Sequence, residues 1–427
     1  MSSSGPLSHG QLSLWRDIQN LPRSRWHEVN LAVVWNLPHG TAPDTVRETL
    51  EYLRTKHVSL RTVYDLDDIW KPVQRPQPPE TAIPLEVSEG TGEDAARTAL
   101  AMAVRPFDLT TEFGWRAHSF TRGGEATHLV FSHHHLASDN WSQGILREEF
   151  EAVLAHGIPA PTGEPYSLVE LADEQRNGSF KGKAAAAERH WEKVLTTSAA
   201  TLGDGRYPVT GEPLPAVQGS LRSAQAQAAA EQLAGALTLP KASVLLTAYA
   251  LAAAEICGLR YVPVRLQSAN RIHPVWGKYV TSMNQWAAAC LEVEPGREFA
   301  ETAAAFHKAA FQGYRCGMYD PDALAELKRR LMPSQPVPEP VWAFNYMTRI
   351  AENPPAPSDA EPTIAWDERV SAIGPRFYSR FIEDGSDELT IWLRGRDADR
   401  GLVSELLFGL HDRLIAAGRA LGAGGGS

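Results

Sequence analysis

The stretch Ser132–Ser142 reads SHHHLASDNWS and brings three imidazoles, one carboxylate and one indole together. Before it, residues 115–120 and 126–132 predict two strands, because the segment Arg122–Glu125 (RGGE) between them is typical of a hairpin turn. After it, residues 142–156 carry apolar side chains at helical spacing. The histidines are therefore expected in a strand-to-helix connection, where a rigid scaffold holds side chains that stay accessible.

Three interpretations of these histidines compete. A metal site is disfavoured, because His133 and His135 share one face of an extended strand while His134 points the other way, and no HExxH or Cys/His spacing supplies a third ligand. Histidines that only fill space or cap the following helix are the second interpretation. The third is a general base, because a His held at the end of a strand can take this role when a nearby carboxylate such as Asp139 fixes the loop.

The composition disfavours several classes of protein. The length of 427 residues exceeds one ordinary core and favours two domains. A formal net charge of −10 without a basic stripe argues against a nucleic-acid partner. No apolar run is long enough for a bilayer and no signal-peptide pattern opens the chain, so we expect a cytoplasmic protein without a membrane partner. The three cysteines are too widely spaced for a zinc pair or a disulfide framework.

The domain boundary is expected in a segment rich in Gly, Pro, Thr and Ser, at about residues 197–220. It separates an N-terminal domain, residues 1–190, from a C-terminal domain, residues 191–427. Both halves alternate helical and strand-like patterns, so the sequence predicts a mixed α/β (α+β) fold.

The string His134–Asp139 reads HHLASD, and HHxxxD followed by Asn140 resembles the HHxxxDG signature of the condensation domains of nonribosomal peptide synthetases. Their superfamily includes chloramphenicol acetyltransferase and related CoA-dependent acyltransferases. Further segments are similar to the family in chain order: LSHGQLSLW (7–15), HVSLRTVY (57–64), PFDL (106–109), NR (270–271), GKYVTS (277–282) and FNY (344–346). The resemblance therefore covers nearly the whole chain.

The resemblance implies two chloramphenicol-acetyltransferase-like subdomains that form a V-shaped pseudo-dimer with a central tunnel. It also implies a free-standing condensation enzyme of natural-product biosynthesis that forms an amide or ester bond. The donor would be an acyl or aminoacyl thioester on the phosphopantetheine arm of a carrier protein acting in trans, and the acceptor a small-molecule or carrier-bound amine or hydroxyl. We expect no bound cofactor and a monomeric enzyme.

Two alternatives remain open. One is a CoA-dependent acyltransferase of the same superfamily, and the other is a catalytically silent recruitment domain of this fold. Retention of His135 and Asp139 favours an active enzyme, whereas the replacement of the signature glycine by Asn140 favours silence.

The resemblance also implies roles for individual residues. His135 would be the active-site histidine, while His134 and Asp139 would shape the loop. Asp139 would form a structural salt bridge, for which Arg271 is the first candidate partner and Arg61 the second.

The expected tunnel carries departures from the family pattern. Glycine at such a turn often supplies a positive φ or room for a ligand, so Asn140 is expected to narrow the tunnel. Thr281 stands where the family has asparagine. Trp141 and Trp276 are the tryptophans for which we expect a pocket role. The predicted tunnel residues are Asn140, Trp141, Ser142, Trp276, Tyr279, Thr281 and Asn345.

Overall fold

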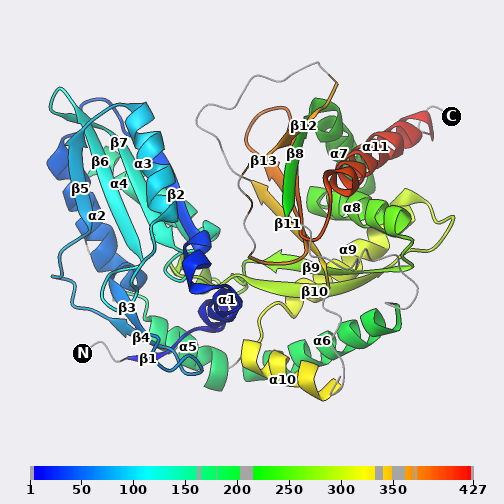
Figure 1. The fold of residues 1–427 in the computed structure, drawn as a ribbon, viewed down its shortest axis with the longest axis horizontal. Coiled ribbons are helices and arrows are strands. Elements are labelled where there is room, and N and C mark those ends of the chain that lie inside the picture. Colours follow the sequence, from blue (N-terminus) through cyan, green and yellow to red (C-terminus); the bar gives the residue numbers. More distant parts are fainter. Residues whose placement is uncertain are drawn as a thin grey trace. The chain divides into compact units, whose positions relative to one another are not determined.

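The computed structural model describes residues 4–160, 165–178, 180–201, 215–331, 340–348, 361–368, 370 and 373–424. The chain divides into two units (Figure 1), unit 1 with residues 1–182 and 269–285 and unit 2 with residues 183–268 and 286–427. A single boundary near residue 190 does not describe this division, because residues 269–285 return to unit 1. Most of the linker predicted at about 197–220 lies outside the described residues.

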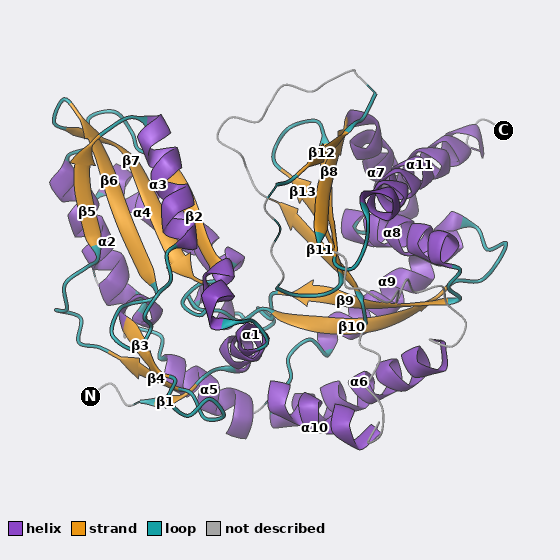
Figure 2. Cartoon of the chain, viewed as in Figure 1, coloured by secondary structure: helices purple, strands orange, loops and turns teal. Residues whose placement is uncertain are grey.

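Unit 1 is built on a four-stranded sheet. Its order is β2 (Asn30–Asn36), β7 (Glu125–His134), β6 (Trp115–Arg122) and β5 (Leu85–Glu89), with only the β5–β6 pair parallel among these neighbours. Helices α2 (Pro43–Lys56) and α4 (Asn140–His156) cover one face, and α3 (Gly92–Val104) covers the other (Figure 2). Side chains alternate along β7, so Leu129 and Phe131 pack with α2 and α4 while Val130 packs with α3.

The predicted hairpin is confirmed as β6 and β7. Gly123 and Gly124 form its two-residue turn with φ of +60° and +86°, a left-handed conformation that glycine adopts without strain. The second strand is longer than expected and runs through His134, because its pairing with β2 continues to Asn30. The two histidines that end β7 are therefore held by the sheet.

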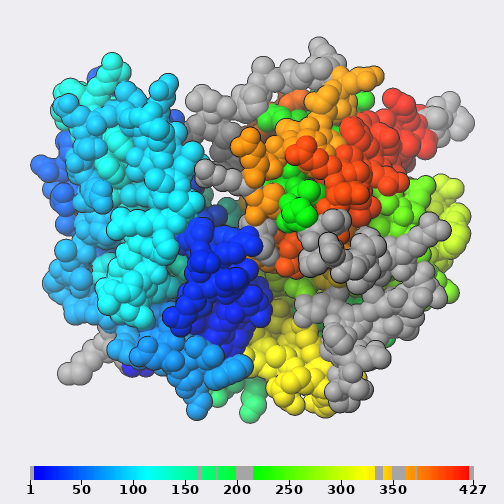
Figure 3. Space-filling view, in the orientation of Figure 1, coloured from blue at the N-terminus to red at the C-terminus, as the bar shows by residue number. Residues whose placement is uncertain are grey.

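The rest of unit 1 lies around a small second sheet and several helices. The small sheet has the order β1 (Gly5–Pro6), β4 (Val73–Pro76) and β3 (Thr62–Asp65). Helix α1 (His9–Gln19) begins with a capping box between Ser8 and Gln11, which satisfies backbone N–H groups that the first turn leaves open. The dark blue residues in Figure 3 are this N-terminal part of the chain on the surface of unit 1. The other helical elements are η1 (Arg23–Val29), η2 (Val58–Arg61), α5 (Leu168–Asn177) and η3 (Trp276–Lys278).

Unit 2 is built on a seven-stranded mixed sheet. Its order is β10 (Gln285–Glu292), β9 (Tyr261–Ser268), β11 (Trp342–Thr348), β13 (Phe377–Glu383), β14 (Leu389–Gly395), β8 (Val217–Ser223) and β12 (Ile364–Trp366). The helices α7 (Ala224–Leu237), α8 (Lys241–Cys257), α9 (Phe299–Arg315) and α11 (Arg400–Gly424) pack with it into one large apolar core. Helices α6 (Lys181–Thr201) and α10 (Pro321–Leu331) pack at β10 in a separate cluster. Both units thus combine sheets with covering helices, which confirms the mixed α/β class.

Helix α8 of unit 2 has buried side chains, mainly alanine and leucine, on all of its sides. Among the described residues, no single helix is long and apolar enough to cross a membrane. The consecutive helices α7 and α8 reach that length and composition only together, across a bend of 113°.

Candidate active site

His133 belongs to the core of unit 1. It stands on the same face of β7 as Phe131, their ring centroids are 6.2 Å apart, and its side chain is fully buried. Burial, together with the nearby His135, lowers its pKa to about 3. A neutral imidazole in an apolar core has a packing role, as expected for the histidine outside the HHxxxD string.

His134 supports the turn that follows it. The backbone N–H of Leu136 donates to His134 Nδ1 at 3.1 Å, so this nitrogen must be unprotonated. The Phe107 ring and the imidazole pack edge-to-face, with centroids 6.1 Å apart at 83°. Burial and then the neighbouring His135 and His133 lower the pKa of His134 to about 3. His134 is thus a neutral hydrogen-bond acceptor that shapes the loop.

His135 opens the turn between β7 and α4 and is only half-buried. It is the most exposed histidine of this group, since His133 and His134 are 0% and 5% exposed, although the Nδ1 atom of His135 is buried. An accessible imidazole on a turn held by a sheet and a helix can meet a substrate without moving the backbone.

Gln11 of α1 and Tyr64 of β3 hold the far side of this turn. The buried amide of Gln11 donates to the carbonyl of Leu136 at 3.5 Å, and the Tyr64 hydroxyl donates to the same carbonyl at 3.4 Å. Gly10 lies so close to Met283 that a Cβ atom would stand 2.5 Å from the Met283 Cα. The opening segment of the chain is therefore part of the site's framework. The motif in this segment resembles the family pattern, but the spacing of its residues does not predict their contacts with Leu136 and Met283.

Asp139 caps helix α4 and is almost fully enclosed. Its Oδ1 accepts from the Ser142 N–H at 2.9 Å and the Ser142 hydroxyl at 2.8 Å, and its Oδ2 accepts from the Met283 N–H at 3.0 Å. Arg271 Nη2 donates to both oxygens at 3.0 Å, and both side chains are 3% exposed. Burial alone would raise the pKa of Asp139, but the Arg271 charge and these hydrogen bonds together lower it. Asp139 is structural in this geometry.

Arg271 forms hydrogen bonds with several backbone carbonyls of residues 269–285, the second segment of unit 1. Besides Asp139, its guanidinium donates to the carbonyls of Trp276, Tyr279 and Thr281 at 3.0–3.1 Å. The residue before it, Asn270, has φ of +53°, an uncommon conformation for a residue with a side chain. The Asn270 amide donates to the Met283 carbonyl at 3.1 Å, which holds this conformation in place. Of the two predicted partners of Asp139, Arg271 forms the ion pair.

Arg61, the second predicted partner, lies elsewhere in unit 1. Its guanidinium donates to the Gln77 carbonyl at 2.5 Å. Burial and then the nearby Arg54 charge lower its pKa. No ion pair joins it to Asp139 in the part of the chain that the structure describes.

Asn140 does not need the backbone conformation of glycine. It is the first residue of α4, and among the described residues with side chains a positive φ occurs at Thr238, Asn270 and Asp397. Of the two reasons that favour glycine here, a positive φ therefore does not apply, and the expected narrowing of the tunnel by the Asn140 side chain stays a prediction. Because Asp139 provides the helix cap, Asn140 can be exposed without disturbing the loop.

The predicted tunnel residues do not share one environment. Trp141 is 50% exposed, and its indole N–H donates to the Gly277 carbonyl at 3.0 Å. Trp276 is 1% exposed and packs against Phe180 with centroids 4.1 Å apart, so the expected pocket role fails for this side chain. Ser142, Tyr279 and Thr281 are also buried, in the framework of the loop. Asn345 lies in unit 2, half-buried on β11.

No group of three or more His, Cys, Asp or Glu side chains suited to a metal ion occurs within the described ranges. His135 supplies a half-buried imidazole on a turn that hydrogen bonds with Gln11, His134 and Asp139 hold.

The fold agrees with comparisons to known proteins. The family model described as Condensation domain matches residues 2–361, and the chain belongs to this family. Cyclosporin synthetase simA of Tolypocladium inflatum is 30% identical over 200 residues, which are 46% of this chain and 1% of that protein. Phosphinothricin tripeptide synthetase PhsC of Streptomyces viridochromogenes is 26% identical over 318 residues, which are 69% of this chain and 28% of that protein. The chain thus spans a small part of these relatives.

A solved structure shows the same fold. The structure described as the molecular basis for condensation domain-mediated chain release from the enacyloxin polyketide synthase has a TM-score of 0.76 with 20% identity. The match covers 98% of this chain and 84% of that one. Condensation domains are acyltransferase-type enzymes that form amide bonds and work with carrier-protein domains.

One consequence of the buried histidines is a dependence of stability on pH. The folded-state pKa values of His133 and His134 are lowered from 6.5 to about 3, so their contribution is complete above pH 6.5 and is lost as pH falls toward 3. We expect the free energy of unfolding to fall in this window by as much as about 1.4 kcal/mol per pH unit for each histidine. Denaturant titrations between pH 8 and pH 4 measure this slope.

A matched pair of variants isolates the effect. His133→Leu removes one of the two groups and should make the slope shallower, because the unfolded chain then binds one proton fewer. His156→Gln removes an exposed histidine at the end of α4 and should leave the slope unchanged. Equal slopes for His133→Leu and the unsubstituted protein would contradict the assignment.

Proposed function

We propose that this chain catalyses condensation between an acyl or aminoacyl thioester donor and an amine or hydroxyl acceptor, which yields an amide or an ester. The donor is carried on the phosphopantetheine arm of a carrier protein, and the enzyme needs no cofactor of its own. The observation that carries the proposal is the division among the histidines. His133 and His134 are buried and neutral, while His135 is accessible on a turn fixed by the Asp139–Arg271 pair.

In this reaction the neutral ring of His135 takes the proton of the acceptor as its nitrogen or oxygen attacks the thioester carbonyl. The new C–N or C–O bond forms, the C–S bond breaks, and the proton passes to the leaving thiolate, which departs as the phosphopantetheine thiol. A thioester is already activated, so the step needs no covalent enzyme intermediate. His134 and Asp139 act through the turn and do not touch the substrate in this scheme. Delivery of the donor in trans and a monomeric state remain predictions.

A donor comparison tests the proposal. The same acyl group is supplied on a phosphopantetheine-bearing carrier protein or on CoA, each with a panel of primary amines and alcohols. We expect acceptor-dependent release of thiol and an acylated acceptor by mass spectrometry, faster from the carrier protein. Faster transfer from acyl-CoA would instead assign a CoA-dependent acyltransferase. Absence of transfer from both donors would contradict the proposal and favour a silent recruitment domain.

A further inference from the structure

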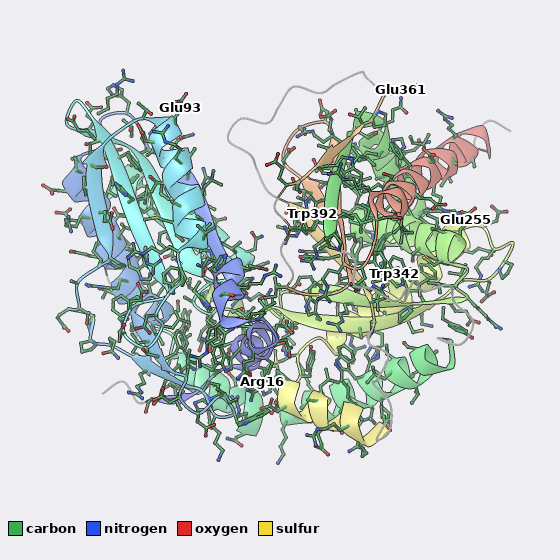
Figure 4. All side chains as sticks on the ribbon, viewed as in Figure 1. Arg16, Glu93, Glu255, Trp342, Glu361 and Trp392 are labelled. Carbon is green, nitrogen blue, oxygen red and sulfur yellow. The ribbon has the colours of Figure 1, made fainter. Side chains whose placement is uncertain are left out.

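The unit 2 sheet has two chemically different faces. On β13 and β14, Phe377, Phe381 and Leu393 point into the apolar core with α7, α8 and α11. Side chains alternate along a strand, so Tyr378 and Arg380 on β13 and Trp392 and Arg394 on β14 lie on the opposite face. In Figure 4, Trp392 lies on the side of the sheet away from these helices, whereas Trp342 belongs to the core.

Aromatic and arginine side chains gather on this face into what we call the aromatic–arginine cluster. Its members are Trp286, Tyr378, Arg380, Trp392 and Arg394. The Tyr378 ring meets Trp286 and Trp392 edge-to-face, with centroids 5.5 Å and 5.8 Å apart. The Arg380 guanidinium lies over both Trp392 and Tyr378, with its Cζ 4.5 Å and 4.8 Å from the ring centroids. The register of the strands causes this contact, because Arg380 stands directly opposite Trp392.

Arg380 keeps its hydrogen-bonding capacity. Within the described ranges its guanidinium has no ion pair and no hydrogen bond, and its buried Nε–H has no acceptor. The carboxylate of Asp367, at the neighbouring strand end, instead accepts from the Trp392 indole at 3.2 Å and the Gln218 amide at 2.5 Å. By contrast, Arg222 on the same sheet pairs with Asp384 and Glu388. A half-buried guanidinium that is stacked on two rings and has no acidic partner among the described residues can present its N–H edge to an anion.

We propose that the aromatic–arginine cluster binds a planar aromatic carboxylate. The carboxylate pairs with the N–H edge of Arg380, and the aromatic ring of the ligand contacts the half-buried indoles of Trp286 and Trp392. Stacking on Tyr378 and Trp392 fixes the guanidinium plane before the ligand arrives, which limits the entropy lost on binding. This site belongs to unit 2 alone and does not rest on the proposed condensation reaction.

Calorimetric titration of the whole chain with 2-naphthoate and with its neutral analogue 2-naphthamide tests this site. We expect 2-naphthoate to bind more tightly than 2-naphthamide. Arg380→Gln should weaken 2-naphthoate about tenfold or more and leave 2-naphthamide unchanged, because only the charged hydrogen bonds are lost. Arg400→Gln is the matched control, since Arg400 also lies over a tryptophan of unit 2, Trp366, at 5.0 Å. It should change neither affinity.

Two further variants separate a loss of ligand binding from a loss of folding. Arg380→Lys keeps the charge without the planar fork and should retain part of the affinity for 2-naphthoate. Trp392→Leu should weaken both ligands. The proposal is overturned if the unsubstituted protein does not bind 2-naphthoate, if Arg380→Gln and Arg380→Lys both bind it normally, or if inorganic phosphate competes as well as the aromatic acid.

Discussion

Asp139→Asn is expected to lower the free energy of unfolding by about 3–5 kcal/mol, because it leaves the buried charge of Arg271 without a partner. The two side chains are each 3% exposed and are joined at 3.0 Å, so water cannot replace the lost carboxylate. The asparagine oxygen can still cap α4 through the N–H of Ser142, but its NH2 group cannot accept from the N–H of Met283, which donates to Asp139 Oδ2. Denaturant titration with intrinsic fluorescence as the readout measures the loss.

A surface pair on the same helix supplies the control. Arg147 and Glu151 form an ion pair at 2.8 Å with side chains 36% and 55% exposed, so Glu151→Gln should change stability by about 1 kcal/mol or less. The double variant Asp139→Asn with Arg271→Met should lose less than the sum of the single variants, because it removes both charges. A loss below about 1 kcal/mol for Asp139→Asn would show that the pair does not hold the loop.

The second large effect is expected at His135. His135→Ala should lower kcat/KM for the condensation reaction by roughly 10²–10⁴-fold, the range typical of a lost general base. Its unfolding free energy should change little, because the side chain is half-buried and the turn is held by other groups. The measurement is the initial rate of product formation with the donor and acceptor found in the donor comparison.

His156→Ala is the matched control, since this histidine is exposed at the end of α4 and should leave the rate unchanged. His134→Ala should lower the free energy of unfolding as well as the rate, because it removes the acceptor for the Leu136 N–H. An unchanged rate for His135→Ala would remove the general-base role. If the rate of His135→Ala falls only as much as its fraction of folded protein falls, His135 has a structural role and not a catalytic one.

Local sequence was sufficient for several features. The glycine pair at 123–124 predicts the hairpin because a tight two-residue turn needs a positive φ at both positions, which glycine adopts without strain. The hairpin signal before the histidines predicts β7, and the helical spacing of apolar residues after them predicts α4. The order of motifs along the chain indicated the condensation-domain family, and its model matches residues 2–361.

Other expectations failed because they depend on neighbours that are distant in sequence. Trp276 was expected at a pocket, but Phe180 and the Arg271 framework bury it. A positive φ was considered at Asn140 because it replaces a glycine, but the cap provided by Asp139 places it in the first turn of a helix. Residues 269–285 were assigned to the second domain, yet contacts with Asp139 and Gly10 attach them to unit 1.

The sequence by itself thus determined the strand, the turn and the helix that carry His134, His135 and Asp139, because those elements follow from local period and turn chemistry. Tertiary structure alone decided which histidine is accessible, since burial depends on packing between the sheet, α1 and α4. It also decided that Arg271, and not Arg61, neutralises Asp139, and that Arg380 stacks on two rings without an acidic partner among the described residues. Such pairings depend on which strands and loops meet in space, and a single sequence does not encode that in its spacing.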